Sequence, residues 1–344
     1  IRTPESKAHF SEVLNTVNSR HPNAQASDDS HFVIGIFGAS SLVFPDRDAS
    51  FPRKLQGSLE DMRVDGRPVR VLNFGYPGMV SATVGGMAAD ALDLYPINLM
   101  VFYTGHNDYN AIFGLVLETY FRPFPPWVDK LNQKIMGKTI ASESNWRHHM
   151  KNVRDPAAAR WLLDYGIIQI DKSLNRRADK EVNTRILNIF QSIADNAAKK
   201  RVPLVVIPPV SSLEYEPISA EGLGEKAFAE AQQEQDPKTR LAALIRARDE
   251  DTFNGNIRVK SSLRTTLRSL SGSHICHIDL EQRLFDAGFS FNKDNFSDEI
   301  HFTPAGHQSV ANTLDSALRE IDFCQKPQSP SNIRQQIENL PGAL

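Results

Sequence analysis

Short apolar runs recur along the chain, and each is rich in Val, Ile, Leu or Phe without strict polar alternation. Runs of this kind are typical of strands that are covered on both faces, as in a parallel sheet. The predicted strands are residues 32–37, 69–74, 97–103, 202–207 and 274–280.

Helical periodicity lies between these runs, at residues 51–62, 80–94, 174–200 and 304–321. Before the last of these, Thr303 is a plausible N-cap and Pro304 stands at the first helical position. Alternation of strand and helix indicates right-handed crossovers and a parallel sheet. The pattern therefore predicts an α/β three-layer sandwich built on a five-stranded parallel sheet.

Two long stretches interrupt this rhythm. Residues 109–172 are rich in aromatic side chains and are too long for a simple crossover, so they are expected to cover a site as a lid. Within 221–270, two short helices meet at Asp236-Pro237 as a hairpin of the tetratricopeptide kind, and one such pair does not form a stable array alone. We therefore predict one domain over 1–324 with two insertions, and a loose tail over 325–344.

The composition excludes several classes of protein. Charged residues make up 23% of 344 residues, with 39 Lys and Arg against 41 Asp and Glu, which is ordinary for a folded domain. A net charge of -2 argues against a nucleic-acid partner. No run of about 18 apolar residues occurs in the sequence given. Since the sequence begins at Ile1 rather than Met, we expect a processed or truncated product, and a signal or membrane anchor upstream would lie outside it.

Only two cysteines occur, Cys276 and Cys324. They are either one disulfide, formed in an oxidising compartment, or two buried thiols. The apolar run around Cys276 favours a small core residue with a free thiol.

Small and polar residues follow three consecutive predicted strands. Ser40 comes just after the first strand, Gly75 ends the second and Asn107 follows the third. The carboxyl ends of parallel strands share one edge of the sheet, where ligands bind. The backbone N–H groups of Ser40 and Gly75 and the amide of Asn107 are thus candidate donors to an oxyanion. Each signal alone is also typical of an ordinary turn.

Asp298 and His301 lie just before the last predicted helix. A serine hydroxyl needs a base to take its proton, and imidazole is the usual base near neutral pH. A carboxylate on the other ring nitrogen fixes the tautomer and stabilises the imidazolium. In isolation, an Asp-x-x-His pair is more often a surface feature.

In this order, residues 38–42, 73–78, 105–108 and 298–301 resemble the SGNH (GDSL-type) hydrolase superfamily, whose members are esterases with a flavodoxin-like sheet. The resemblance implies Ser40 as nucleophile, His301 as base and Asp298 as its orienting carboxylate. Ser40, Gly75 and Asn107 would form the oxyanion hole. Ala39 departs from the family pattern, which has Asp there, and this weakens the label more than the mechanism. The layout is also similar to large bacterial SGNH esterase-like proteins that are associated with tetratricopeptide repeats.

Other polar residues have simpler interpretations. Adjacent side chains on a helix point about 100 degrees apart, so His148 and His149 are predicted to be a solvated pair rather than metal ligands. His106, beside Asn107, is equally a loop residue or a neighbour of the site. His307, inside the last predicted helix, is expected to be structural.

The predicted function is a serine esterase that cleaves a carboxylic ester through an acyl-enzyme, with no cofactor and no metal. The substrate would be a small-molecule, glycan or lipid ester, such as an O-acetyl group on a glycan. The alternatives are an O-acyltransferase that uses the same site and a non-catalytic scaffold that binds protein partners through the helical hairpin. The resemblance slightly favours a bacterial extracytoplasmic or membrane-associated location.

Overall fold

The structure is a computed structural model that describes residues 4–21, 30–109, 172–217, 219, 222–251 and 258–320. Most of the predicted aromatic-rich lid, including His148 and His149, and the predicted tail lie outside the described residues. The strands are β1 (Phe32–Gly38), β2 (Arg63–Val64), β3 (Arg67–Gly75), β4 (Ile97–Tyr103), β5 (Leu204–Val206) and β6 (Ile275–His277).

These strands form one six-stranded sheet in the order β2-β3-β1-β4-β5-β6. Five of them are parallel, and only β2 runs antiparallel, to the start of β3. In chain order the parallel strands are arranged 2-1-3-4-5, which is the flavodoxin-like arrangement. The predicted sheet is therefore confirmed, with β2 as a short addition at its edge. The order reverses at β1, between β3 and β4, where such folds bind ligands.

The strands differ in length from the predicted ones where the local chemistry changes. β5 is confined to Leu204–Val206, between Pro203 and the pair Pro208-Pro209, because proline has no N–H to donate to a sheet. β6 ends at His277, because Asp279 is the N-cap of the next helix and accepts a hydrogen bond from Gln282 N. Residue 280 was predicted as strand and instead begins a helix.

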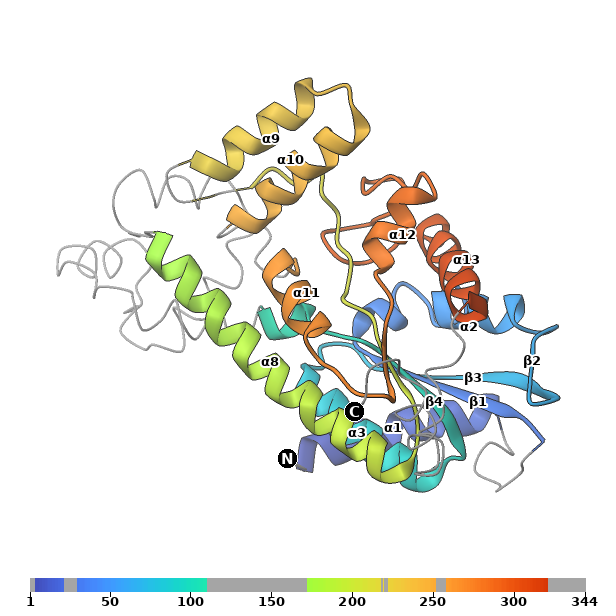
Figure 1. The fold of residues 1–344 in the computed structure, drawn as a ribbon. Helices are drawn as coiled ribbons and strands as arrows, with labels where there is room; N and C mark the ends of the chain where they lie inside the picture. Colours follow the sequence, from blue (N-terminus) through green and yellow to red (C-terminus); the bar gives the residue numbers. More distant parts are fainter. Residues whose placement is uncertain are drawn as a thin grey trace, which may run out of the picture.

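Helices cover both faces of the sheet, as Figure 1 shows. One face packs against α1 (Pro4–Arg20), α3 (Ser81–Leu94), α8 (Lys172–Lys200) and α11 (Ser261–Arg268). The other packs against α2 (Phe51–Ser58), α12 (Leu280–Asp286) and α13 (Pro304–Glu320). The three-layer sandwich is therefore confirmed.

The sequence did not predict α1 as a helix, because most of its residues are polar. Phe10, Val13 and Val17 nevertheless lie on one side of α1 and are buried in the core. The spacing of three and four residues between them is the helical signal.

The predicted helical hairpin is present as α9 (Leu223–Gln233) and α10 (Pro237–Glu250). It projects beyond the sheet in Figure 1. Asp236 caps α10 by accepting a hydrogen bond from Thr239 N, and Pro237 stands at the start of the helix. The two helices pack on each other, and Ala231, Ala243 and Leu244 join the core on the α13 face.

Cys276, at the middle of β6, is disulfide-bonded. The favoured prediction of a free core thiol is therefore wrong for this residue, and its side chain is only partly buried. The one other cysteine of the sequence is Cys324, which lies outside the described residues. Among the helices that are described, none has the length and apolar character needed to span a membrane.

Candidate active site

Ser40 lies at the carboxyl end of β1, as the first residue of the short 3-10 helix η1 (Ser40–Leu42). The first N–H groups of a helix have no acceptor within it, so the Ser40 N–H remains available. Leu42 is fully buried and anchors this turn, whereas Ser40 is partly exposed. The geometry presents both the hydroxyl and the backbone N–H of one residue at the end of the sheet.

A tight loop presents Asp298 and His301. An antiparallel bridge between Phe296 and Phe302 closes the loop, and Ser297 N donates a hydrogen bond to the carbonyl oxygen of His301. The Asp298 carboxylate accepts from the N–H groups of Ile300 and His301, at 2.9 and 2.8 Å. This side-chain turn, which Asp favours, holds both functional groups in one orientation.

Ser40, His301 and Asp298 form a continuous chain of hydrogen bonds. His301 Nε2 lies 2.8 Å from Ser40 Oγ, and His301 Nδ1 lies 2.6 Å from Asp298 Oδ2. Burial raises the pKa of Asp298, but the bonds from the His301 side chain and from two N–H groups outweigh it, so this pKa lies below its ordinary value. An ionised carboxylate thus orients an imidazole that contacts a hydroxyl, which is the arrangement that activates serine.

His307 contacts the backbone at Phe44 and Phe51, on the segment that follows η1. Its Nε2 donates to the carbonyl oxygen of Phe44 at 2.7 Å, and its Nδ1 accepts from Phe51 N at 3.1 Å. Burial lowers the pKa of His307 to about 4, in keeping with a neutral ring that donates at one nitrogen and accepts at the other. The ring of Phe44 lies 4.5 Å from that of His301. The structure therefore gives His307 the structural place that the sequence predicted.

Asn107 and Asp108 follow β4 and join the loop after β3. Asn107 Nδ2 donates to the carbonyl oxygen of Met79 at 2.9 Å, which leaves its second amide hydrogen for a ligand. The Asp108 carboxylate accepts from the N–H and hydroxyl of Ser81, at 2.9 and 2.8 Å. Since Ser81 begins α3, the carboxylate satisfies a free N–H at the positive end of that helix. The two loops are thereby fixed together.

Gly75 does not offer a free N–H, so that prediction from the sequence is wrong. Its N–H donates to the Asn73 side chain at 2.9 Å, and its carbonyl oxygen accepts from Arg47. Gly75 is buried, and a Cβ built on it would lie 2.5 Å from Leu42 Cβ. Glycine is required here because η1 packs directly on the end of β3.

Gly78 is the better donor on this loop. It is exposed, and no acceptor for its N–H is found in the described part of the chain. Its φ of 76° lies in the left-handed region that glycine adopts readily. The neighbouring carbonyl of Met79 is the one that Asn107 contacts, which places this turn beside the Asn107 amide. The sequence signal was the Pro77-Gly78 pair, which was read only as a turn.

The family model for GDSL-like Lipase/Acylhydrolase matches residues 34–314. A search of curated proteins finds no match.

Among solved structures, a GDSL-like lipase from Bacteroides thetaiotaomicron is 10% identical, with a TM-score of 0.43, and the match covers 90% of this chain and 98% of that chain. An esterase, EstA, from Pseudoalteromonas sp. is 12% identical, with a TM-score of 0.39 and coverage of 84% and 97%. A lipase/acylhydrolase from Enterococcus faecalis is 12% identical, with a TM-score of 0.35 and coverage of 84% and 95%.

Proposed function

The chain belongs to the GDSL-like lipase/acylhydrolase family and is an ester-hydrolysing enzyme, and from that premise we propose that Ser40 is its nucleophile. His301 is the general base, and Asp298 orients it. The observation that carries this proposal is the chain of two short hydrogen bonds from Ser40 Oγ through His301 to Asp298.

In the first half of the reaction, Ser40 Oγ attacks the ester carbonyl carbon while His301 Nε2 takes the hydroxyl proton. The tetrahedral intermediate collapses, and the C–O bond to the alcohol breaks as His301 returns the proton to the leaving oxygen. In the second half, His301 takes a proton from water as the water oxygen attacks the carbonyl carbon of the acyl-enzyme. The bond from that carbon to Ser40 Oγ then breaks, His301 returns the proton to Ser40 Oγ, and the carboxylic acid is released. Asp298 stabilises the imidazolium in both halves.

The oxyanion of the intermediate is held by three N–H donors in this proposal. They are the backbone N–H of Ser40, the free amide hydrogen of Asn107 and the backbone N–H of Gly78, which replaces Gly75. Loss of one such donor is expected to lower kcat about 100- to 1000-fold. Asn107→Ala is the direct test, because it removes a side-chain donor without changing the backbone.

Hydrolysis of p-nitrophenyl acetate by wild type, Ser40→Ala and Ser41→Ala tests the nucleophile. Ser41 is the neighbouring serine and is buried, so it is a matched control that alters the same turn. We expect Ser40→Ala to lose about 10⁴-fold or more in kcat/KM, and Ser41→Ala to keep most of its activity. Equal activity of wild type and Ser40→Ala rules the nucleophile out.

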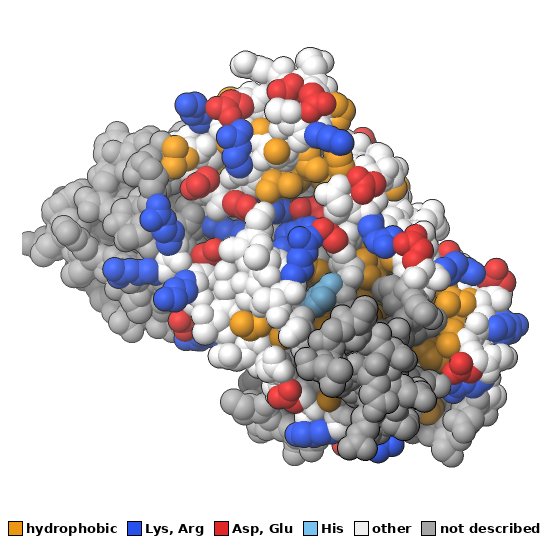
Figure 2. Space-filling model, in the orientation of Figure 1, with side chains coloured by type: hydrophobic (Ala, Val, Ile, Leu, Met, Phe, Trp, Pro, Cys, Tyr) orange, Lys and Arg blue, Asp and Glu red, His pale blue; other side chains and the backbone are white. Residues whose placement is uncertain are grey.

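The proposed substrate is a small uncharged ester, such as an acetyl group on a glycan, with a lipid ester as the alternative. The formal net charge of the chain is -2, and Figure 2 shows Lys and Arg interspersed with Asp and Glu over the face that it draws. Rates on p-nitrophenyl esters of increasing acyl length separate the two substrates: an acetate preference supports the glycan ester, and a long-chain preference supports the lipid.

An O-acyltransferase is the second candidate, because an acyl-enzyme at Ser40 can pass its acyl group to an alcohol instead of water. Adding a glycan acceptor and measuring transferred against released acyl groups separates the two. A scaffold that acts only through the α9–α10 hairpin does not need the Ser40–His301–Asp298 chain. We propose one catalytic domain with this hairpin as an insertion.

We also propose that the protein works in an oxidising compartment. The support is the disulfide at Cys276, since structural disulfides persist outside reducing compartments. Titration of the native protein with N-ethylmaleimide is expected to find no reactive thiol, and two reactive thiols per chain contradict the proposal.

A further inference from the structure

A second concave site lies at the edge of the sheet, away from the Ser40 hydroxyl. Beyond the short contact with β2, strand β3 has no neighbouring strand on its outer side in the part of the chain that the structure describes. A cavity of about 390 Å³ lies there, lined by α1, β3, α2 and the loop before α2. This volume is in the range of pockets that hold small ligands.

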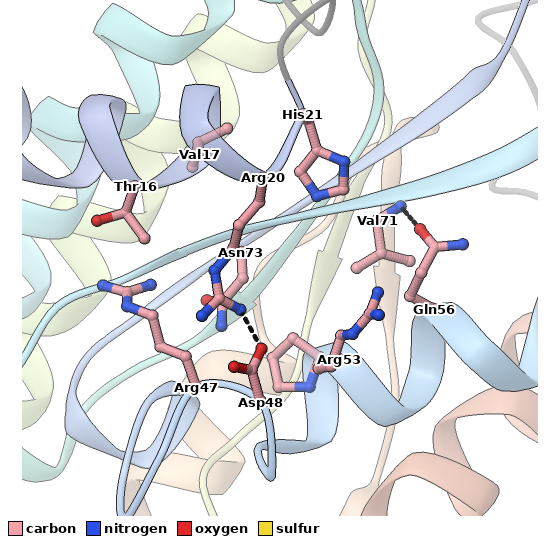
Figure 3. A pocket seen from close by; sticks show the side chains of 11 residues that line it. Thr16, Val17, Arg20, His21, Arg47, Asp48, Arg53, Gln56, Val71 and Asn73 are labelled. Carbon is pink, nitrogen blue, oxygen red and sulfur yellow. Dashed lines mark hydrogen bonds and ion pairs between the residues drawn. The ribbon is translucent and has the colours of Figure 1, made fainter.

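Positive side chains from three parts of the chain line this pocket. Arg20 comes from the end of α1, Arg47 from the loop before α2 and Arg53 from α2 (Figure 3). The one carboxylate in the lining is Asp48, which pairs with Arg20 at 2.5 Å. Three guanidinium groups against one carboxylate leave two positive charges in the pocket.

Among the described residues, most of the N–H donors of these arginines have no acceptor. Arg47 Nη2 donates to the carbonyl oxygen of Gly75 at 2.7 Å, and that is its one side-chain bond in the described residues. The Arg53 guanidinium makes no hydrogen bond or ion pair within the part of the chain that the structure describes. Guanidinium groups bind oxyanions through paired N–H donors, so these groups are suited to a ligand with several oxygens.

The electrostatic environment agrees with an anionic ligand. Burial lowers the pKa of Arg47 and the neighbouring Arg20 lowers it further, which together outweigh the opposite effects of Glu12 and Tyr76. Burial also lowers the pKa of His21, with added effects of Arg70 and Arg53, so this ring is neutral near pH 7. Such mutual repulsion of like charges is relieved when an anion binds between them.

The uncharged part of the lining gives the pocket a fixed shape. Gln56 Oε1 accepts from Val71 N at 2.6 Å, which satisfies the open edge of β3. Asn73 Nδ2 donates to the carbonyl oxygen of Leu42 at 2.9 Å, so it belongs to the same packed turn as η1. The side chains of Val17 and Val71 form an apolar part of the pocket wall.

We propose that this pocket binds a phosphate group, either as a soluble phosphate compound or as the phosphate monoester of a lipid headgroup. A phosphate monoester carries about -1.5 to -2 charges at pH 7, which matches the two positive charges of the lining. A carboxylate carries one charge and leaves half of them uncompensated. The site does not use Ser40 or His301, and it is independent of the esterase chemistry.

Thermal unfolding in the presence of sodium phosphate, against sodium chloride of the same ionic strength, is the first measurement. Binding to the folded state raises the unfolding temperature. We expect a larger rise in phosphate than in chloride, and a loss of affinity of about tenfold or more in Arg53→Gln, because a charged hydrogen-bonding group is removed. Arg53 is exposed and carries no side-chain bond in the described structure, so this variant keeps the fold.

Arg185→Gln is the matched control, since Arg185 is an exposed arginine on α8 that pairs with Glu181. It is expected to bind phosphate as the wild type does. Glycerol 3-phosphate and vesicles of phosphatidylcholine with and without phosphatidic acid distinguish the two sources of the phosphate. Binding that depends on Arg53 in any of these measurements supports the site. Equal binding by wild type and Arg53→Gln throughout, or an equal effect of chloride, overturns it.

Discussion

Strands β1, β3 and β4 have seven to nine residues each, whereas β5 and β6 have three residues each. We call the three long strands the apolar half, and the two short strands with the hairpin, α11 and α12 the charged half, because buried ion pairs join these helices. In the apolar half, the ring of Phe37 stacks on the rings of Phe74 and Phe102 from the neighbouring strands, with ring centroids 4.7 and 5.2 Å apart. This half provides Ser40 and Asn107.

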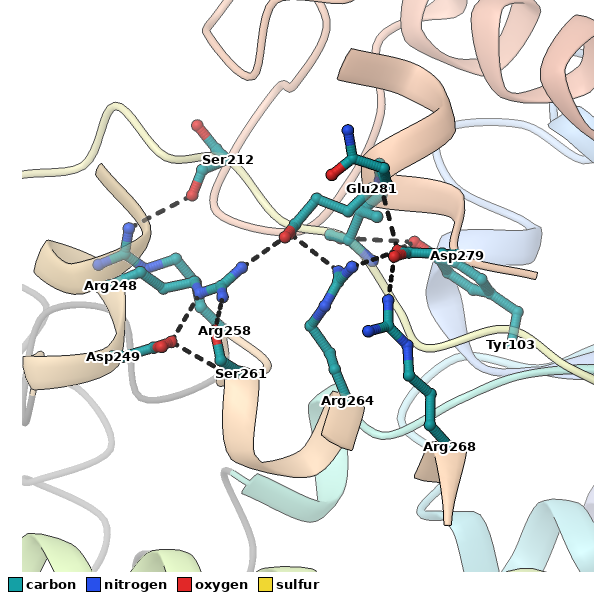
Figure 4. Close-up of polar contacts among 12 residues, drawn as sticks. Tyr103, Ser212, Arg248, Asp249, Arg258, Ser261, Arg264, Arg268, Asp279 and Glu281 are labelled. Atoms are coloured by element: carbon teal, nitrogen blue, oxygen red, sulfur yellow. Dashed lines mark hydrogen bonds and ion pairs between the residues drawn. The ribbon is translucent and has the colours of Figure 1, made fainter. Parts of the chain in front are cut away.

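The charged half is held together by ion pairs between side chains of different elements (Figure 4). Glu281 of α12 lies 2.8 Å from Arg248 of the hairpin and 3.0 Å from Arg264 of α11. Arg258 pairs with Asp251 at 2.5 Å, and both side chains are almost fully buried. Ion pairs thus join the hairpin to the core. Removal of one partner from a buried ion pair lowers the stability of the fold strongly, because the other charge stays buried without compensation.

The loop of His301 depends on this charged half. Arg258 donates to the carbonyl oxygen of Ser212 at 3.3 Å, and Ser212 N donates to the carbonyl oxygen of Glu299 at 2.9 Å. The contact between Ser40 and His301 therefore joins two halves that are stabilised by different forces. The proposed nucleophile, Ser40, is held by apolar packing, and the proposed base, His301, lies on a loop next to buried ion pairs.

The largest effect is expected from Glu281→Gln, because it removes the buried carboxylate that Arg248 and Arg264 share. Arg248 keeps Asp249 and Arg264 keeps Asp279 as partners, but one positive charge of the buried cluster is then uncompensated. We expect the free energy of unfolding to fall by about 3–5 kcal/mol. Glu320→Gln is the control, since Glu320 pairs with Arg283 at the exposed surface and its loss is expected to change the free energy of unfolding little. Urea unfolding of both variants measures the difference. Equal costs contradict the view that buried charges organise this half.

The apolar half contains one buried carboxylate, Asp108, and no ion pair to it is found in the described residues. Burial raises its pKa to about 6 from 3.8, although bonds from Ser81 oppose the shift. Between pH 4 and 6 the folded state keeps a proton that the unfolded state has lost, so the free energy of unfolding falls as the pH rises. The expected decrease from this group is about 3 kcal/mol.

Asp108→Asn is expected to remove this part of the pH dependence, because the amide does not titrate and its oxygen still accepts from Ser81. Urea unfolding of wild type and variant at pH 4, 5, 6 and 7 measures it. A difference between the two proteins that does not change with pH shows that Asp108 does not titrate in this window.

The smallest effect is expected from Ile36→Val in the middle of β1. Ile36 is fully buried, and removal of one methylene group costs about 0.5–1.5 kcal/mol. Ile245→Val in α10 is the comparison, because Ile245 is only partly buried on the hairpin and a smaller cost is expected. The order of the two costs, measured by chemical unfolding, shows whether the apolar half is the more tightly packed. A larger cost at Ile245 reverses that view.

The sequence was most informative where one physical signal dominated. The apolar runs predicted all five parallel strands, and residues 97–103 were predicted with the observed ends. Ser40, His301 and Asp298 were found because their order and residue types match known chemistry, and the structure brings them into contact across 261 positions of the chain.

Features that depend on tertiary partners were not predictable in this way. The N–H of Gly75 is occupied because Asn73 folds back on it, which no local pattern indicates. The ion pairs of Arg248 and Arg264 with Glu281 were not predicted, since Glu281 lies on a distant element. The disulfide at Cys276 was one of the two predicted alternatives but not the favoured one, because the apolar neighbours of Cys276 resemble those of a core thiol.

The central claim is that Ser40 is activated by His301, and reaction with a fluorophosphonate probe tests it directly. Such a probe labels a serine hydroxyl that is activated as a nucleophile. We predict one label per chain on the peptide that contains Ser40, in wild type and in Ser41→Ala, and none in Ser40→Ala. Labelling is also expected to fall sharply in His301→Ala. Equal labelling of wild type and Ser40→Ala, or labelling of neither protein, contradicts the account.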